Sequence, residues 1–511
     1  MKYVLTNEQM RTADKYTIEE LGVPSLELME RAGRALAREA EDMLALGGKK
    51  IRERVLCVCG GGNNGGDGFV CARILNGRGV ETDVVSVAEK RSLECRENYE
   101  KFVAAGGRVL TKLPERGYSV VVDCLLGTGF HGELCGELLR AAEGINALKA
   151  QGAKVLSADI PSGVNGDNGE VKTAVITDRT LCIGERKAGA YLGDGIDCAG
   201  EIVCADIGIK LPDRAESYAL LTDRESVAAL VEKRKRNTHK GSYGRAAIVA
   251  GSAAYTGAAY LATAACLRAG AGYTALFAPK GILPYYMLKA PEALLAPICE
   301  GENILFEESG FGKLLGYDSV AYGMGCGVSR AVSDGAKYLL KNYAGKLILD
   351  ADALNSLAAY EKENFAELFG EKKCDTAITP HCKEFSRLTG ESVETILKNG
   401  LSAPAAFAKE YGVCVLLKNA VSVLTDGERT AVNAAGCAGQ AKGGSGDVLS
   451  GVIASLCASG LTAFDGARAG AYLVGRAAEL AAKEVGEYSL VASDVVAYLG
   501  RAFLELRADQ E

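Results

Sequence analysis

The sequence predicts an α/β protein with two domains, each built in three layers with a mainly parallel sheet between helices. Two observations lead to this fold class. Short apolar runs, most of them ending in Gly, Ser or Pro, alternate with helical segments, and this happens in two separate series along the chain. The chain has 511 residues, more than a single hydrophobic core normally accommodates, and its 63 glycines suit many tight strand-to-helix turns.

The first domain, residues 1–212, begins with helices and continues with the alternating pattern. PSLELMERAGRALAREAEDMLALGG predicts a helix with Ser25 as its N-cap and Gly47-Gly48 as its stop. The expected strands are RVLCVCGGG, ETDVVSVA, SVVVDCLLG and KVLSADIPSG, and the sheet is extended by RTLCIG and GEIVCADIG.

A charged stretch separates the two series. It ends in VEKRKRNTH and predicts a linker over residues 213–235, with a solvated helix that belongs to either domain as the alternative. The second, larger domain covers residues 236–511. Its expected strands are RAAIVAG, GYTALFAP, DSVAYGMG, KLILDAD, DTAITPH, VCVLLKN and SVLTDG.

Composition and charge exclude several classes of protein. The 58 basic and 65 acidic residues are spread along both halves, so we expect no nucleic-acid partner. MKYVLTNEQMRTADKY lacks the pattern of a secretory signal, and glycines interrupt the longest uncharged run, residues 246–267, so we expect no membrane span and a cytoplasmic location. Most of the seventeen cysteines lie in apolar runs without a CxxC pair, which predicts buried, reduced thiols.

The first candidate site follows the strand RVLCVC, where residues 60–73 read GGGNNGGDGFVCAR. The glycines allow positive φ and a close approach to a ligand, and the start of the next helix favours a phosphate. Asn63, Asn64 and Asp67 add oxygen ligands suited to an alkali or alkaline-earth cation. A turn that merely connects two elements is the alternative.

Two other strand ends carry matching polar residues. Asp123 lies in VVDCLLGTGFHGE, and Asp159 and Ser162 lie in SADIPSG. If the strands are neighbours, Asn64, Asp123 and Ser162 can share one cation, which leaves Asp159 as an acid or base that faces the ligand. Aspartates that cap the next helix are the alternative.

These motifs together resemble a known family over about residues 1–212. MxxxLTNEQMRxxD, LMERAGRA, GGGNNGGDGFVCAR, DCLLGTGF, SADIPSGVNGDNGE and GERKAGAYLGDG are similar to the NAD(P)H-hydrate epimerase domain, which implies a Rossmann-like fold. The resemblance implies that Asn64, Asp123 and Ser162 hold a potassium ion, and the acid–base role inferred above makes Asp159 the candidate catalytic residue. The resemblance also implies a binding site for the hydrated dinucleotide, formed by Asn63, Asn64, Gly65, Gly66, Asp67, Gly127, Thr128, Gly129, Phe130, His131, Gly132, Glu133 and Asp159.

The second candidate site is AKGGSGDVLSG, residues 441–451, where glycines precede a helix whose first turn contains Asp447. Backbone N–H groups at such a helix start can bind a phosphate, and the lack of a P-loop lysine disfavours a Walker-type NTPase. An aspartate here makes chemical sense if it accepts a proton from a substrate hydroxyl that attacks the bound phosphoryl group. An acidic residue that is simply favoured in a first helical turn is the alternative.

Other strand ends in the second domain carry small or polar residues: GMGCG (residues 323–327), LDADALN (349–355) and TPHCKE (379–384). His381 stands out because the chain has only three histidines, although a structural histidine is the alternative. The segment HKGSYGRAAIVAGSAAYTGAAYLATAACLRAGAGY is rich in small residues that permit close packing or close ligand approach.

The second domain resembles the ribokinase-like superfamily, and more closely its NAD(P)H-hydrate dehydratase branch, over about residues 236–505. The motifs HKGSYGRAAIVAGSAAYTGAAYLA, GMGCG, LDADALN, TPHCKEF, LLKNA and AKGGSGDVLSG carry this resemblance. It implies phosphorylation of the ring hydroxyl followed by loss of phosphate, with ADP as donor, Mg²⁺, and Asp447 as the base. The implied hydrate-binding residues are Ala258, Gly325, His381 and Asp447, and the implied nucleotide-binding residues are Lys418, Asn419, Ala420, Val421, Ser422, Gly444, Ser445 and Gly446. Met324, Cys382, Lys383 and Asn419 depart from the residues usual in that family.

The two resemblances predict an enzyme that repairs hydrated NADH and NADPH. Its first domain would interconvert the R and S hydrates, and its second would dehydrate the S hydrate. One alternative makes the second domain a kinase that releases a stable phosphorylated product, and another makes the first domain only a nucleotide-binding or regulatory module. The expected partners are small molecules (the hydrates and ADP), and we expect a homo-oligomer.

Overall fold

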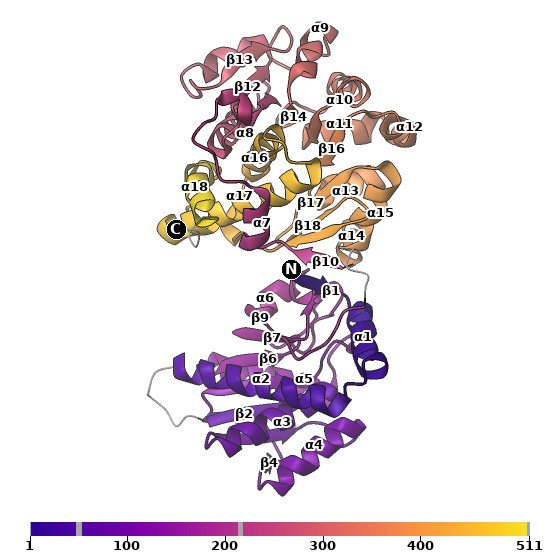
Figure 1. The fold of residues 1–511 in the computed structure, drawn as a ribbon, viewed down its shortest axis with the longest axis vertical. Helices are drawn as coiled ribbons and strands as arrows, with labels where there is room; N and C mark the ends of the chain where they lie inside the picture. Colours follow the sequence, from indigo (N-terminus) through magenta and orange to yellow (C-terminus); the bar gives the residue numbers. More distant parts are fainter. Residues whose placement is uncertain (1, 47–53, 213–217, 508–511) are drawn as a thin grey trace. The chain divides into compact units, whose positions relative to one another are not determined.

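The structure, a computed structural model, describes residues 2–46, 54–212 and 218–507. The chain divides into two units, of which the first is Lys2–Tyr218 and the second begins at Ala219 (Figure 1). Residues 213–217 of the predicted linker lie outside the described residues. The rest of that segment contains strand β10 (Ala219–Leu221) and helix α7 (Arg224–Leu230), which belong to the second unit, so part of the segment matches the alternative of a helix within a domain.

The first unit contains a seven-stranded sheet in which all neighbouring strands are parallel. In spatial order the strands are β4 (Arg108–Leu110), β3 (Glu81–Ser86), β2 (Arg54–Cys59), β5 (Val120–Cys124), β6 (Lys154–Ala158), β7 (Arg179–Ile183) and β9 (Glu201–Ala205). A separate short pair joins β1 (Tyr3–Leu5) to β8 (Arg186–Lys187). The helices are α1 (Asn7–Lys15), α2 (Ser25–Leu46), α3 (Asn63–Gly77), α4 (Leu93–Ala104), α5 (Gly136–Ala150) and α6 (Gly195–Ala199), with a π-helical turn, η1 (Tyr16–Glu20), after α1.

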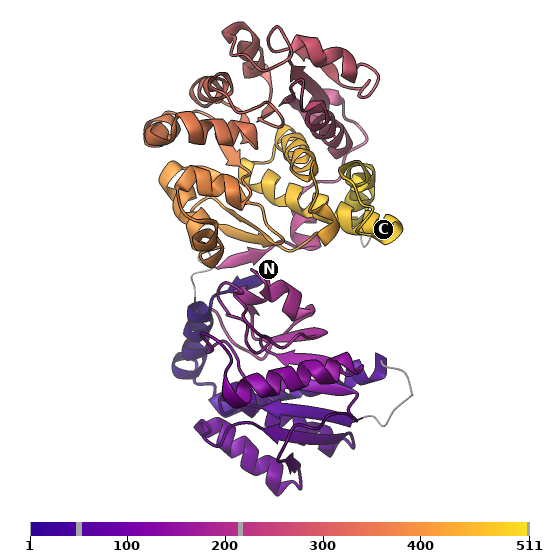
Figure 2. The same cartoon turned by 180° about the vertical axis from the view of Figure 1, so that it is seen from behind.

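Both faces of this sheet are covered by helices (Figures 1 and 2). Alternate residues of a strand point to opposite faces, so β2 buries Val55, Cys57 and Cys59 against α2, α3 and α4, and Leu56 and Val58 against α5. The predicted three-layer arrangement is therefore confirmed for this unit.

One detail of the predicted first helix is wrong. Helix α2 starts at Ser25 itself, and the carbonyl of Pro24 accepts the first backbone hydrogen bonds, so Ser25 is the first helical residue and not the N-cap. Its hydroxyl instead donates to Glu94 Oε1 at 3.1 Å. A proline before a serine moves the cap because the fixed φ of proline already suits a helix start. The predicted stop at Gly47-Gly48 lies outside the described residues.

The second unit contains a larger sheet with a parallel centre and an antiparallel flank. In spatial order the strands are β13 (Leu294–Pro297), β12 (Tyr273–Ala278), β11 (Arg245–Val249), β14 (Ser319–Tyr322), β15 (Lys346–Leu349), β16 (Asp375–Ile378), β17 (Cys414–Leu417), β18 (Ser422–Thr425), β19 (Thr430–Asn433) and β10. Strand β18 runs antiparallel to β17 and to β19, whereas the other neighbours are parallel.

Two groups of helices cover the two faces of this sheet, which confirms three layers here as well. On one face lie α7, α8 (Thr256–Ala269), α16 (Ser445–Ala458), α17 (Ala463–Val485) and α18 (Ala492–Glu505). On the other lie α9 (Glu308–Phe311), α10 (Arg330–Asn342), α11 (Asp352–Tyr360), α12 (Phe365–Gly370), α13 (Cys382–Thr389), α14 (Val393–Lys398) and α15 (Ser402–Tyr411).

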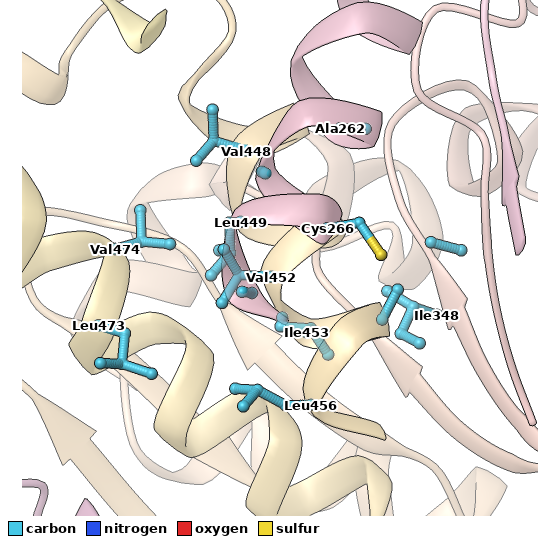
Figure 3. Close-up of a cluster of buried hydrophobic side chains, with 14 of the residues drawn as sticks. Ala262, Cys266, Ile348, Val448, Leu449, Val452, Ile453, Leu456, Leu473 and Val474 are labelled. Carbon is cyan, nitrogen blue, oxygen red and sulfur yellow. The ribbon is translucent and has the colours of Figure 1, made fainter. Parts of the chain in front are cut away.

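Helix α16, which carries the candidate base, is packed tightly against α8 (Figure 3). A Cβ atom on Gly451 would lie only 2.1 Å from the carbonyl oxygen of Ala262, so the two backbones touch and only glycine fits. Val452 and Ile453 of α16 are fully buried in the same cluster. This contact fixes the position of the start of α16.

All seventeen cysteines are free thiols and thirteen of them are buried, which confirms the expected burial. Within residues 2–46, 54–212 and 218–507, no helix is long and apolar enough to cross a membrane.

Candidate active sites

The first site forms where three neighbouring strands end. Strand β2 lies beside β5, and β5 beside β6, so the glycine turn before α3, the loop after Cys124 and Asp159 share the carboxyl edge of the sheet. A cavity of about 960 Å³ opens there. The predicted residues that line it are Asn63, Asn64, Asp67, Gly127, Thr128, Gly129, Phe130, His131 and Asp159.

Four other residues predicted for this site, Gly65, Gly66, Gly132 and Glu133, do not line the cavity. Gly65 and Gly66 are buried behind it, where a Cβ on Gly65 would lie 2.1 Å from the carbonyl oxygen of Gly60. Gly132 and Glu133 continue the loop as exposed residues. The buried pair thus supports the turn by close packing.

The three predicted cation ligands are connected through the backbone of Leu126. Asn64 Nδ2 donates to the Leu126 carbonyl at 2.8 Å, and the Leu126 N–H donates to Ser162 Oγ at 2.9 Å. Ser162 Oγ in turn donates to Asp123 Oδ1 at 2.7 Å. Burial raises the pKa of Asp123, although hydrogen bonds from Ser162, Leu125 and Ser157 oppose the shift.

This cluster has the chemistry of an alkali-cation site. The side-chain oxygen of Asn64 is buried and has no hydrogen-bond partner among the residues that the structure describes, and Asp123 is a fully buried carboxylate. A buried amide oxygen without a hydrogen-bond donor, next to a buried carboxylate, costs folding free energy unless a cation binds between them. The residues therefore fit a potassium ion.

Asp159 is held in a specific orientation with one oxygen free. Its φ of 71° is in the left-handed region, which is rare for a residue with a side chain. Oδ1 accepts from the Ile183 N–H at 3.1 Å and forms an ion pair with Lys187 Nζ. Oδ2 lies 3.7 Å from where a Cβ on Gly127 would be, so it faces the loop that lines the cavity.

Four further charged residues line this cavity that the sequence did not predict: Arg11, Asp14, Glu94 and Lys187. Lys187 is almost completely buried and also donates to the carbonyls of Ile183 and Glu185. Burial lowers its pKa, but the nearby Asp159 outweighs this, and the net shift is upward. Asp14, from α1, lines the same cavity, and its pKa is raised to about 6, mainly by burial. Asp14 lies in the motif MxxxLTNEQMRxxD and Lys187 lies in GERKAGAY. The charged residues of these two motifs were therefore the available signal in the sequence.

Asp67 has a pKa well above its usual value, because it is buried and because Asp159 and Asp14 are nearby. The cavity therefore brings Asp14, Asp67 and Asp159 near one lysine, and these groups cannot all be ionised at low cost.

The second site also lies at the carboxyl edge of its sheet. Strands β11, β14, β15, β16 and β17 are consecutive in space, so the loops that follow them meet. The loop after β14 is hydrogen-bonded to the start of α11 after β15, since the Gly327 N–H donates to Asp352 Oδ2 at 2.8 Å. The predicted hydrate residues Ala258 and Gly325 are also in contact, since a Cβ on Gly325 would lie 2.9 Å from Ala258 Cβ.

Asp447 lies in the first turn of α16, behind Gly444, whose φ of 97° requires glycine. The first N–H groups of a helix have no acceptor within the helix and attract an anion. Burial, followed by the charge of Asp350, raises the pKa of Asp447 to about 7, although Lys418 lowers it. Asp447 is thus a carboxyl group that is ready to gain or lose a proton near neutrality.

An ion pair that the sequence analysis did not foresee supports this helix start. Lys418 Nζ contacts Asp350 Oδ1 at 2.8 Å, and Ser450 Oγ donates to Asp350 Oδ2 at 2.7 Å. A Cβ on Gly446 would lie 3.2 Å from Lys418 Nζ, so the lysine reaches the glycines of the motif. Lys418 therefore links the predicted nucleotide segment to the predicted anion site.

The other predicted nucleotide residues differ in exposure. Asn419 and Ala420 are exposed in the β17–β18 connection, Val421 is buried, and Ser422 begins β18. Ser445 Oγ donates to the carbonyl of Gln440 at 2.8 Å, which closes the turn before α16.

His381 has a clear structural role. It caps α13, where its Nδ1 accepts from the N–H groups of Lys383 and Glu384 at 3.1 and 3.2 Å. A backbone bridge places it next to Lys418, and burial together with the Lys418 charge lowers its pKa. It thus caps α13 at the edge of the site.

Comparisons with known proteins cover the whole chain. A family described as YjeF-related protein N-terminus matches residues 25–189, and one described as NAD(P)H-hydrate dehydratase matches residues 246–500. A protein of Thermofilum pendens, "Bifunctional NAD(P)H-hydrate repair enzyme Nnr", is 35% identical over 98% of this chain and 96% of its own length. The chain belongs to the bifunctional NAD(P)H-hydrate repair enzyme family. A Moorella thermoacetica member with the same name is 33% identical over 100% of this chain and 98% of its own.

A solved structure supports the fold of the dehydratase part of this repair enzyme family. The Bacillus subtilis ADP/ATP-dependent NAD(P)H-hydrate dehydratase, co-crystallised with ATP and Mg²⁺, is 26% identical with a TM-score of 0.50. It matches over 56% of this chain and 99% of its own length. The ribokinase-like fold expected for the larger unit is confirmed.

Proposed function

We propose that this protein repairs hydrated NADH and NADPH through two reactions. The first unit interconverts the R and S hydrates, and the second dehydrates the S hydrate at the expense of a nucleotide. The observation that carries the proposal is that relatives named bifunctional NAD(P)H-hydrate repair enzymes match the chain from end to end, while each unit presents a polar site at the carboxyl edge of its sheet.

In the first unit, Asp159 is the acid–base residue. Its ion pair with Lys187 and its bond from Ile183 N–H hold Oδ1, which leaves Oδ2 to act on a ligand in the cavity. The glycine turn and the loop through Gly127 bind the dinucleotide. Asn64, Asp123 and Ser162 would hold potassium, whose charge would neutralise Asp123 and tie the two loops together.

In the second unit, Asp447 is the general base. It accepts the proton of the ring hydroxyl while that oxygen attacks the terminal phosphoryl group and the rest of the nucleotide leaves. Phosphate is then lost together with a proton from the neighbouring ring carbon, which restores the double bond. The N–H groups at the start of α16 stabilise the charge on the transferred group. The residues from Lys418 to Ser422 lie along the nucleotide, for which we infer ADP as the donor.

The charges around Asp447 fit a magnesium nucleotide. Asp350 and Asp352 raise the pKa of Asp447 through their charges, whereas Lys418 lowers it. The carboxylate of Asp352 would hold magnesium, which would neutralise phosphate charge that these acids otherwise repel. We expect the protein to act as a homo-oligomer in the cytoplasm.

Absorbance recovery tests this function. A mixture of hydrated NADH epimers is incubated with Mg²⁺ and either ADP or ATP, and the near-ultraviolet absorbance of NADH is followed. Full recovery by the wild-type protein, and none by Asp447→Asn, supports both reactions and identifies the donor. A stable phosphoester without recovered absorbance would show a kinase instead, and recovery that stops when the S hydrate is used up would remove the epimerase assignment.

A further inference from the structure

Two carboxylates enter the cavity of the first unit from different elements of the fold. Asp159 follows strand β6, whereas Asp14 projects from helix α1, and both side chains line the same cavity of about 960 Å³. Asp14 has no role in the function proposed above. Its helix is fixed in place by a capping box at Thr6 and by Asn7, whose N–H donates to Asp167 Oδ1 at 2.7 Å.

Exchange of the two hydrates needs two acid–base groups. The reacting carbon carries a hydroxyl group that must leave from one face of the ring and return on the other, which requires a proton donor on one side and an acceptor on the other. Asp159 is bound through Oδ1 to Lys187 and Ile183, so it cannot swing between faces. A second group must therefore reach the ring from another wall of the cavity.

We propose that Asp14 is the second catalytic acid–base residue of the epimerase reaction and acts on the face of the ring opposite to Asp159. The inference rests on the proposed function of the first unit and adds a residue to it. The observation behind it is that α1 places a half-buried carboxyl group in the cavity that also contains the fixed carboxylate of Asp159.

The reaction is balanced without any further reagent. The bond between the ring carbon and its hydroxyl oxygen breaks with both electrons on oxygen, the Asp14 carboxyl gives its proton to that oxygen, and water leaves. The lone pair of the ring nitrogen stabilises the cation that remains. Water then adds to the opposite face and gives a proton to Asp159, and transfer of that proton back to Asp14 restores the starting state. In the reverse direction the two residues exchange roles.

The surroundings of Asp14 suit a group that gains and loses protons. The charged or titratable side chains that line the same cavity are Arg11 from its own helix, Asp67 from α3, Glu94 from α4, His131 from the loop after β5, Asp159 after β6 and Lys187 from β8. Burial and the Asp159 charge raise the pKa of Asp14 to about 6, and Lys187 opposes them. Asp67 is less suitable, because it is buried more deeply than Asp14, and this burial raises its pKa well above the usual range.

Three variants of the full-length protein test the role of Asp14: Asp14→Asn, Asp14→Glu and, as a matched control, Glu8→Gln. Glu8 lies on the same helix but is exposed and outside the cavity. The assay starts from the isolated R hydrate with potassium and without nucleotide, so that no dehydration occurs, and follows formation of the S hydrate by chromatography.

We expect Asp14→Asn to lower kcat of exchange by about 100-fold or more, with little change in KM, because general acid–base groups contribute on this scale. Asp14→Glu, which keeps the carboxyl group, should recover part of the rate, and Glu8→Gln should match wild type. The wild-type rate should fall as pH rises through about 6, where Asp14 loses its proton, and the residual rate of Asp14→Asn should lack this limb.

A wild-type exchange rate in Asp14→Asn, or the same pH limb in that variant, would overturn the inference while the proposed function stands. Equal and large losses in Asp14→Asn and Asp14→Glu, with a wild-type melting temperature in both, would also overturn it. Absence of exchange above the uncatalysed rate in the wild-type protein would instead overturn the function of the first unit.

Discussion

The burial of Asp447 should cost the protein stability, and its replacement by asparagine should return that stability while abolishing dehydration. In the unfolded chain this carboxyl group ionises near 3.8, whereas in the folded protein its pKa is about 7. Between these values the folded state holds a proton that the unfolded state has lost, so the free energy of unfolding falls as pH rises.

The size of the stability change follows from the pKa shift of Asp447. A difference of about three pKa units, at 1.36 kcal/mol each, amounts to about 4 kcal/mol above pH 7. Asparagine cannot ionise, so the stabilisation by Asp447→Asn should grow by about 3 kcal/mol between pH 5 and pH 8. The same variant should lose about 100-fold or more in the rate of dehydration, because it cannot accept the hydroxyl proton.

Differential scanning calorimetry without ligands, at pH 5 and pH 8, measures the stability change, and absorbance recovery measures the rate. Glu428→Gln is the matched control, because Glu428 is an exposed carboxylate in the same unit, and it should change neither quantity. Equal stability of Asp447→Asn and wild type at pH 8, or dehydration at the wild-type rate, would refute the reasoning. For the wild-type protein, the rate should also rise about tenfold from pH 6 to pH 8 as Asp447 ionises.

Further changes test the packing and the first site. Gly451→Val should destabilise the second unit by several kcal/mol, because its Cβ would lie 2.1 Å from a backbone oxygen of α8. Gly500→Ala, in open space on α18, should instead stabilise the unit by up to about 1 kcal/mol. Urea unfolding compares the two variants. Lys187→Met should remove exchange and lower the melting temperature, because the partly buried carboxylate of Asp159 loses its cation; an unchanged melting temperature would contradict this. Asp123→Asn should abolish any dependence of hydrate exchange on potassium. The test is to measure the exchange rate at increasing potassium chloride concentrations while a bulky organic cation keeps the ionic strength constant.

The sequence predicted the fold well where the pattern was local. Apolar runs followed by glycine or aspartate identified most of the strands whose ends form the two sites, because a parallel strand buried on both faces leaves a continuous apolar run. The motifs placed Asp159 at such a strand end and Asp447 in the first turn of a helix. The position of Ser25 was wrong by one residue because a preceding proline shifts a helix start, which composition alone does not show.

What the sequence did not predict depends on contacts between distant segments. Lys187 is 28 positions from Asp159, and Asp350 is 68 positions from Lys418, so no spacing rule pairs them. A buried ion pair becomes visible only when the fold brings its members together. The same holds for Asp14, whose helix looks like an ordinary amphipathic segment in the sequence.

The division of one chain into two units, each with its own buried core, has a consequence for the cell. Every translated copy delivers one site of each kind, so transcription cannot alter the ratio between the two catalysts. The flux of repair is then set by whichever reaction is slower per molecule. Selection can adjust the balance only through the turnover of each site, and a mutation that damages one unit cannot be offset by making more of that unit alone.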